Sequence, residues 1–271
     1  MGFPIRVLSI QDLSCLGKCS LTVALPVLSA MGHACTVLPT AVLSTHTAFP
    51  NPHCHSLTED ILSIAAHWSS VGAEFDAVSI GYLADPLQAE KVGKVLDLFQ
   101  STVILDPAMG DHGKLYSGQT PEHVQAMAQL CRRADYILPN LTEAALLTGL
   151  PYREEADAGY LRELADGMLA FGAGAVVITG FTRADGQTGF YGARKDGDTF
   201  TYQANRIPRH FHGTGDLFAA VFAGGLLRGK DAPEAATLAA RFVERAIAVT
   251  RESSPFGIAF EPELPWLWEQ L

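Results

Sequence analysis

Short runs of β-branched and apolar residues alternate along the chain with longer stretches of helical periodicity. The runs predict strands at 5–10, 34–39, 76–80, 102–106, 135–138 and 175–179, and a hairpin from 188–192 and 198–204. The remaining stretches predict helices at 20–31, 57–70, 86–100, 121–132, 141–148, 157–171, 215–228 and 233–251. This alternation is typical of a mainly parallel sheet with helices on both faces, an α/β fold with three α/β/α layers.

Nothing in the sequence divides the chain into separate units. It contains no internal repeat, no low-complexity tract and no linker rich in proline, glycine and serine. With 271 residues it is long enough to bury a sizeable core. We therefore expect a single domain over residues 1–271.

Charge and composition exclude several classes of partner. The net charge is −10 and the basic residues form no stripe, which argues against binding to nucleic acid. The first ten residues lack the apolar segment of a signal peptide, and no later stretch approaches the roughly 18 apolar residues of a membrane span. The five cysteines have no disulfide-framework spacing and indicate reduced thiols. We expect a cytoplasmic protein that binds neither nucleic acid nor membrane.

Three segments resemble known ligand motifs but lack their essential features. His53-Cys54-His55 has no second ligand pair at zinc-finger spacing, so we expect an exposed loop there. Gly17-Lys18-Cys19-Ser20 looks like the end of a P-loop, yet Asp12 stands where the leading glycine belongs and Cys19 where the magnesium-binding hydroxyl belongs. Gly172-Ala173-Gly174 precedes a strand instead of following one, unlike a dinucleotide fingerprint.

A better anion site is predicted at the segment FHGTGDLFAAVFAGG, residues 211–225. Gly213, Thr214 and Gly215 let backbone N–H groups approach an anion at the start of a helix. Asp216 is then either a first-turn acid that complements the helix dipole or a base that accepts a proton from a substrate hydroxyl. Phosphoryl transfer needs little more than such a base, an anion cradle and a metal ion.

Further polar residues follow the predicted strands, where open α/β sheets bind their ligands. Asp106 ends the strand at 102–106 and Asp111 follows it, and Asn140 and Glu143 follow the strand at 135–138. We expect these acids and several hydroxyls to converge on one cleft. Glu143 is also the N3 acid of a capping box that begins at Asn140, so a purely structural role is the alternative for it.

The stretch HGTGDLFAAVFAGGLL resembles the C-terminal signature of the ribokinase-like superfamily, and its GTGDLFAA form resembles that of pyridoxal kinases. Four other stretches agree in order and spacing: SIQ at 9–11, LSTHT at 43–47, LDPAMGDHGKLY at 105–116 and LPNLTEAALLTG at 138–149. GYLAD at 81–85 is similar to a substrate-side segment of the family. The resemblance therefore spans nearly the whole chain.

The resemblance implies a ribokinase-like fold, a homodimer, and transfer of a phosphoryl group from ATP to the 5′-hydroxymethyl group of pyridoxal, pyridoxamine or pyridoxine. Mg²⁺ and a K⁺-like ion would offset the phosphate charge. The residues implied on the substrate side are Ser9, Thr47, Tyr82 and the base Asp216, beside the cradle Gly213, Thr214 and Gly215. Those implied for ATP are Asp111, Tyr116, Asn140, Glu143, Thr179 and Thr214. Those implied for metal are Asp106, Asp111 and Glu143.

The chain also departs from the pyridoxal kinase pattern. LSCLGKCSLTVALP at 13–26 replaces a GHxGN-like turn, and Leu138 stands where threonine often precedes Pro-Asn. Hydroxymethylpyrimidine kinases of thiamine synthesis share the resemblance but typically have cysteine in the GxGC turn, where this chain has Asp216. Such a kinase is one alternative function, and a ligand-binding homologue with a decayed catalytic site is another.

Overall fold

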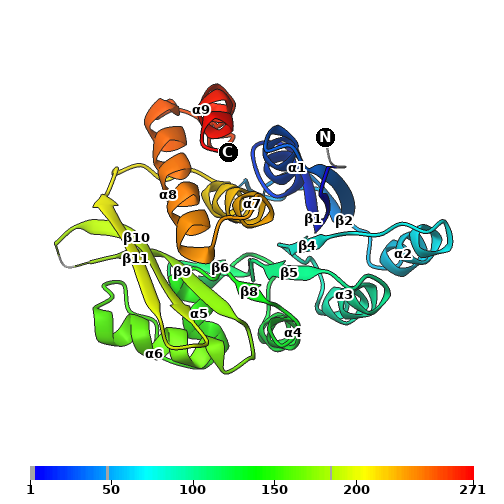
Figure 1. Cartoon of the computed structure of the whole chain (residues 1–271), viewed down its shortest axis with the longest axis horizontal. Coiled ribbons are helices and arrows are strands. Elements are labelled where there is room, and N and C mark those ends of the chain that lie inside the picture. The colour runs from blue at the N-terminus through cyan, green and yellow to red at the C-terminus, as the bar shows by residue number, and fades with distance from the viewer. Residues whose placement is uncertain (1–3, 47–48, 184) are drawn as a thin grey trace.

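The computed structural model describes residues 4–46, 49–183 and 185–271 and is built on a nine-stranded sheet (Figure 1). The strand order is β11-β10-β9-β8-β5-β4-β1-β2-β3. The neighbours from β9 to β2 pair in parallel: β1 (Arg6–Leu16), β2 (Ala34–Thr45), β4 (Ala77–Ile80), β5 (Thr102–Leu105), β8 (Tyr136–Ile137) and β9 (Ala175–Thr182). The edges are antiparallel: β3 (Cys54–Ser56), β10 (Gln187–Arg194) and β11 (Thr199–Asn205). The predicted, mainly parallel sheet is confirmed.

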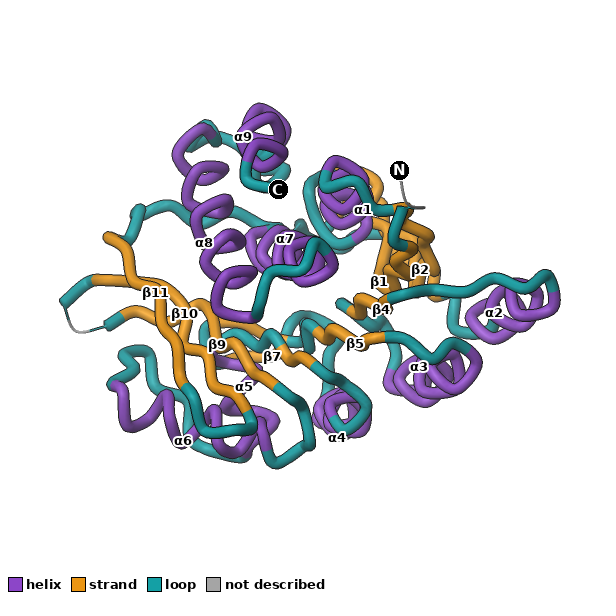
Figure 2. The backbone as a smooth tube through the Cα atoms, in the orientation of Figure 1, coloured by secondary structure: helices purple, strands orange, loops and turns teal. Residues whose placement is uncertain are grey.

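Helices cover both faces of this sheet (Figure 2). One apolar core lies under α2 (Asp60–Ser70), α3 (Pro86–Leu98), α4 (Pro121–Cys131), α5 (Leu141–Thr148) and α6 (Ala158–Leu169). The second lies under α1 (Leu21–Ala30), α7 (Thr214–Leu227), α8 (Ala232–Val249) and α9 (Leu264–Glu269). The predicted α/β/α sandwich is confirmed. Within the described residues, no helix combines the length and the apolar character needed to cross a membrane.

Short polar side chains fix where several helices begin. Asp85, Asn140, Asp157 and Asp231 each accept a hydrogen bond from a backbone N–H two or three residues later, at the starts of α3, α5, α6 and α8. Such caps satisfy N–H groups that the first turn of a helix leaves free. These starts are encoded locally, and each lies within one residue of its predicted position.

The structure also contains elements that the pattern did not predict. β1 and β2 continue to Leu16 and Thr45. Beyond a register shift after Gln11, Leu13 pairs with Val42, Ser14 with Leu43 and Leu16 with Thr45. The expectation of a loop at His53-Cys54-His55 was wrong, because Cys54–Ser56 pairs with the edge of β2. Edge pairing satisfies backbone groups whatever the side-chain pattern. A hairpin, β6 (Gly110–Asp111) and β7 (Lys114–Leu115), and α9 are further additions.

Candidate active site

The first turn of α7 lies at the carboxyl ends of the central strands of the sheet. Asp106 follows β5 directly, and Asn140 follows β8, whose parallel neighbour β9 contains Thr179. The Thr179 N–H donates to the Pro139 carbonyl oxygen at 2.9 Å and so joins these two segments. From the opposite layer, the Cβ position of Gly215 lies 3.9 Å from Asp106 Oδ2. Residues predicted for nucleotide, metal and base therefore gather where open α/β sheets bind ligands.

The first turn of α7 presents free backbone donors. Gly213 has φ 86°, and a Cβ there would clash with the Lys18 carbonyl oxygen, so only glycine fits. The first i→i−4 bond of the helix runs from the Leu217 N–H to the Gly213 carbonyl at 2.9 Å. The N–H groups of Thr214 and Gly215 precede that bond. Together with the helix dipole they favour an anion at this position.

Four carboxyl groups crowd this edge: those of Asp12, Asp106, Glu143 and Asp216. Burial raises the pKa of each, to about 6 for Asp12, and the charge of Asp216 raises the pKa values of Asp12 and Asp106 further. Among the described residues, no ion pair joins any of the four to a lysine or arginine. The site therefore concentrates negative charge that the protein itself does not neutralise.

Asp216 has the surroundings of a general base. Its side chain is only partly exposed, so desolvation raises its pKa, whereas the Ser20 N–H, the Cys19 thiol and the nearby His212 ring lower the same pKa. The opposing effects leave a carboxyl group whose pKa is higher than usual but which hydrogen bonds stabilise in its ionised form. A carboxylate of that kind in a cleft is suited to accept a proton near neutral pH.

Glu143 takes part in both the capping box and the acidic cluster. Its Oε2 accepts the Asn140 N–H at 2.8 Å, and Asn140 Oδ1 accepts the Glu143 N–H at 3.0 Å. Oε1 accepts the Met109 N–H at 3.1 Å, and the Asn140 amide donates to the Gly110 carbonyl at 2.7 Å. Glu143 is 2% exposed, and its pKa is raised by burial and by the charge of Asp106. The predicted capping geometry is present, and it ties α5 to the segment after β5.

The hairpin β6–β7 brings Asp111 and Tyr116 to the rim of this edge. The Tyr116 N–H donates to the Met109 carbonyl at 3.0 Å, and the pKa of its phenol is raised by burial and by the charges of Glu143 and Asp111. The Asp111 side chain is 52% exposed and lies 3.6 Å from His112 Nε2. Asp111 therefore lies outside the buried group of acids.

On the predicted substrate side, the structure separates residues that the sequence grouped. Ser9 is 0% exposed, and its Oγ accepts from Gln11 Nε2 at 2.9 Å, so the Ser9 hydroxyl is engaged by a protein side chain and not presented at the surface. Tyr82 is half-buried, and its pKa is raised by burial and by the charge of Asp12. Thr47 lies outside the described residues.

Two further residues belong to this site although sequence reasoning did not assign them. Asp12 is 4% exposed and close enough to Asp216 for its pKa to be raised by that charge. The ring of His46 stacks on that of His212, with 4.4 Å between ring centroids. Both residues follow or end a predicted strand, as the assigned acids do. The sequence places Asp12 after the strand at 5–10 and His46 after the strand at 34–39, where open α/β sheets bind ligands, but it assigns neither residue a role.

The acid pair Asp106 and Glu143 fits a divalent cation that arrives with its own ligands. In the described parts of the chain, no three His, Cys, Asp or Glu side chains are arranged to hold a metal ion by themselves. The two carboxyl groups nevertheless lie close enough for the charge of Asp106 to raise the pKa of Glu143. Mg²⁺ commonly takes only one or two protein carboxylates and completes its shell with water and phosphate. A pair of carboxyl groups without a basic partner satisfies that requirement.

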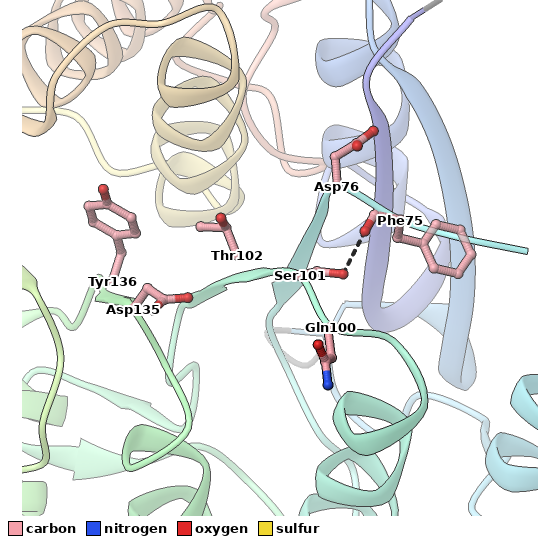
Figure 3. A pocket seen from close by; sticks show the side chains of 7 residues that line it. All are labelled: Phe75, Asp76, Gln100, Ser101, Thr102, Asp135 and Tyr136. Carbon is pink, nitrogen blue, oxygen red and sulfur yellow. Dashed lines mark hydrogen bonds between the residues drawn. The ribbon is translucent and has the colours of Figure 1, made fainter.

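A surface hollow of about 670 Å³ lies at the opposite ends of the strands, their amino ends (Figure 3). Its lining residues include Asp76, Thr102 and Asp135, which lie at the amino ends of β4, β5 and β8. The Asp135 carboxylate already accepts the Val103 N–H at 2.8 Å. This hollow is separate from the acids and helix start described above, and parallel sheets bind ligands at the opposite strand ends.

Comparison with known proteins places these features in a family context. The phosphomethylpyrimidine kinase family matches residues 25–261. A pyridoxine/pyridoxal/pyridoxamine kinase of Bordetella bronchiseptica is 31% identical over 269 residues, which cover 92% of this chain and 91% of that protein.

Solved structures are similar over the same extent. Pyridoxal kinase from Lactobacillus plantarum superposes with a TM-score of 0.91 at 36% identity, covering 98% of this chain and 97% of that one. A Bacteroides thetaiotaomicron protein described as a phosphomethylpyrimidine kinase, in a crystal form with pyridoxal, gives 0.93 at 34% identity, covering 97% and 96%.

Proposed function

The chain belongs to the phosphomethylpyrimidine kinase family, and we propose that within this family it transfers the γ-phosphoryl group of ATP to the 5′-hydroxymethyl group of pyridoxal, pyridoxamine or pyridoxine. The observation that carries this proposal is the position of Asp216, in the first turn of α7 beside the free N–H groups of Thr214 and Gly215. The activity for which the Bordetella relative is named and the pyridoxal in the Bacteroides crystal form support the vitamin B6 substrate class.

The chain's own residues supply the base and the anion cradle. Asp216 accepts the proton of the substrate hydroxyl. The hydroxyl oxygen bonds to the γ-phosphorus, and the bond between the γ-phosphorus and ADP breaks. The N–H groups of Thr214 and Gly215 hold the transferring phosphoryl oxygens at the helix start. Because Gly213 has no Cβ, this turn can pack directly against the Lys18 carbonyl, and that contact holds the turn in position. Phosphoryl transfer asks mainly for such positioning and charge stabilisation.

We assign the nucleotide side to the segments after β8 and β9. Asn140 and Thr179 pair across these strands, Thr214 begins α7, and Tyr116 directly follows β7. Ser9, Gln11, Tyr82 and the undescribed Thr47 belong to the vitamer side, with Ser9 acting through Gln11. With this division the vitamer hydroxyl and the γ-phosphate would meet beside Asp216, where the base can accept the hydroxyl proton.

Asp106 and Glu143 would hold Mg²⁺ together with the ATP phosphates, with Asp111 contacting the ion or its water shell from the rim. A bound Mg²⁺ would supply charge neutralisation for the phosphates beside these acids. The same unneutralised charge suits a K⁺-like ion near Asp106. We further propose that residues 1–271 form one kinase domain that acts as a homodimer in the cytoplasm.

The test is a coupled assay of ADP release with pyridoxal, pyridoxamine, pyridoxine and hydroxymethylpyrimidine as alternative substrates. We expect a higher kcat/KM for at least one B6 vitamer than for hydroxymethylpyrimidine, because Asp216 stands where pyrimidine kinases typically have cysteine. The reverse order would assign the chain to pyrimidine phosphorylation. ADP release with none of the four, while a vitamer still binds, would favour a decayed ligand-binding homologue.

A further inference from the structure

The turn between β1 and α1 contains a non-glycine residue with an uncommon backbone conformation. Ser20 has φ 51° and ψ −121° and immediately precedes α1. Residues other than glycine rarely adopt positive φ, and where they do the surrounding structure has to hold them. Ser20 is 4% exposed, so protein contacts and not solvent surround it. Such residues cluster at active sites.

The Ser20 hydroxyl is used to hold this turn and not to cap the helix. A serine at an N-cap usually accepts a hydrogen bond from an N–H of the first turn. Within the described chain the Ser20 side chain caps no N–H of α1, and its Oγ donates instead to Asp12 Oδ1 at 2.5 Å. The other oxygen of Asp12 accepts from Ser14 Oγ at 2.9 Å. We call this arrangement, in which the buried Asp12 carboxylate holds the Ser20 hydroxyl, the Asp12 clamp.

The clamped turn lies directly against the start of α7. A Cβ on Gly213 would clash with the Lys18 carbonyl oxygen, so the two backbones are in contact. The Ser20 N–H and the Cys19 thiol also lie close enough to the Asp216 carboxylate to lower its pKa. If the Ser20 backbone rotated to an ordinary negative φ, the path of the chain between Lys18 and α1 would change, and with it the contact of this turn with Gly213.

We propose that Asp12 and Ser20 are positioning residues for Asp216, because the Asp12 clamp holds Ser20 at positive φ and thereby holds the turn whose Lys18 carbonyl lies against Gly213 at the start of α7. This inference rests on the proposed function, since it requires Asp216 to act on a substrate hydroxyl. It accounts for a serine with a buried acidic partner at a position whose dihedral angles suit glycine. Ser20 acts through Asp216 and has no need to touch either substrate.

The test compares two replacements at the same position. Ser20→Ala removes the hydroxyl but keeps the Cβ that disfavours positive φ, whereas Ser20→Gly removes the hydroxyl and the Cβ together. We expect Ser20→Ala to lower kcat by about 10- to 100-fold, the order expected when a catalytic group is misplaced by about 1 Å. Ser20→Gly should exceed Ser20→Ala in kcat by at least about tenfold, because glycine adopts positive φ without a partner. The KM for ATP should stay within about threefold in both.

Ser14→Ala is the matched control. It also removes a hydrogen bond to the Asp12 carboxylate, the one of 2.9 Å from Ser14 Oγ. Ser14, however, lies within β1 and is not part of the turn that contains Lys18 and Ser20. Its kcat should stay within about threefold of the wild type. All variants are measured at saturating pyridoxal and ATP, with a thermal melt to establish the folded fraction.

Equal kcat values for Ser20→Ala and Ser20→Gly would overturn the inference. If both were high the conformation would be irrelevant, and if both were low the hydroxyl itself would be required. Should Ser20→Ala fail to fold, Asp12→Ala and Asp12→Asn give the same comparison, since asparagine keeps an Oδ1 acceptor; equal kcat there also refutes the clamp. A wild-type protein that phosphorylates no B6 vitamer refutes the proposed function and this inference with it, whereas an active wild type with matched variants refutes this inference alone.

Discussion

Replacing Asp216 with asparagine separates a catalytic base from a residue that merely starts a helix. The asparagine side chain in Asp216→Asn keeps the size and much of the hydrogen bonding of aspartate but cannot take a proton. Loss of a general base typically costs about 10²- to 10⁴-fold in rate, or roughly 3–5 kcal/mol in the barrier. Loss of a first-turn acid that only complements the helix dipole costs up to about 1 kcal/mol of stability and little rate.

The structure also fixes the expected sign of the stability change. Asp216 raises the pKa values of Asp12 and Asp106, which means that the charged groups repel one another. Its own pKa is raised mainly by burial, so its ionisation disfavours the folded state as the pH rises through that pKa. At pH 8, Asp216→Asn should therefore melt at the same temperature as the wild type or higher, while kcat falls by at least about 100-fold.

The assay is kcat for pyridoxal and for pyridoxamine at saturating ATP, with single-turnover measurements to establish that chemistry limits the rate. Vitamer binding, followed by absorbance, should be retained. Glu122→Gln is the matched control, because Glu122 is a first-turn acid of α4 at the protein surface. A variant Asp216→Asn within about threefold of wild-type kcat, with chemistry rate-limiting, would leave the mechanism without its base.

Three further changes test the site. Glu143→Gln and Glu143→Ala should both lower kcat at least about tenfold, but only alanine should also lose the cap, at about 1 kcal/mol. Between pH 4 and 7, Asp12→Asn should become more stable than the wild type by on the order of 2–3 kcal/mol. Burial raises the pKa of Asp12 to about 6, so the wild type loses stability as the pH rises through that value, whereas asparagine does not ionise. Gly213→Ala should destabilise more than Gly118→Ala by at least about 1–2 kcal/mol, since both have φ near 87° but only Gly213 would place a Cβ against backbone.

Each of these has a plain contrary result. Full activity of the folded fraction of Glu143→Ala would reduce Glu143 to its capping role. For Asp12→Asn, the free energy of unfolding is measured with urea at each pH. If its difference from the wild type does not change with pH, the pKa of Asp12 is not raised in the folded state. Equal melting temperatures for the Gly213 and Gly118 variants would show that the turn before α7 can move away from Lys18; around Gly118 no described atom lies within 4 Å of the Cβ position.

Local features of the sequence specify the layers, most helix starts and the glycine turn before α7. These features depend on residues close together in the chain: alternation of strand and helix periods, a polar side chain that caps the N–H groups just after it, and glycines next to an acid at a helix start. Asn140 and Glu143 form their capping box as predicted. Local hydrogen bonds and local periodicity need no knowledge of the rest of the fold.

Tertiary packing determines which acids share one site and which residues are accessible to a ligand. Ser9 is buried beneath Gln11, Asp111 lies at the rim, and Asp12 joins Asp216 across two elements that are distant in sequence. Strand order and register determine which residues meet at an edge, and the chain pattern of a single strand does not carry them. The Ser20 conformation likewise depends on the Asp12 carboxylate reaching it across the turn. The desolvation that shifts these pKa values exists only once both layers of helices have closed over the sheet.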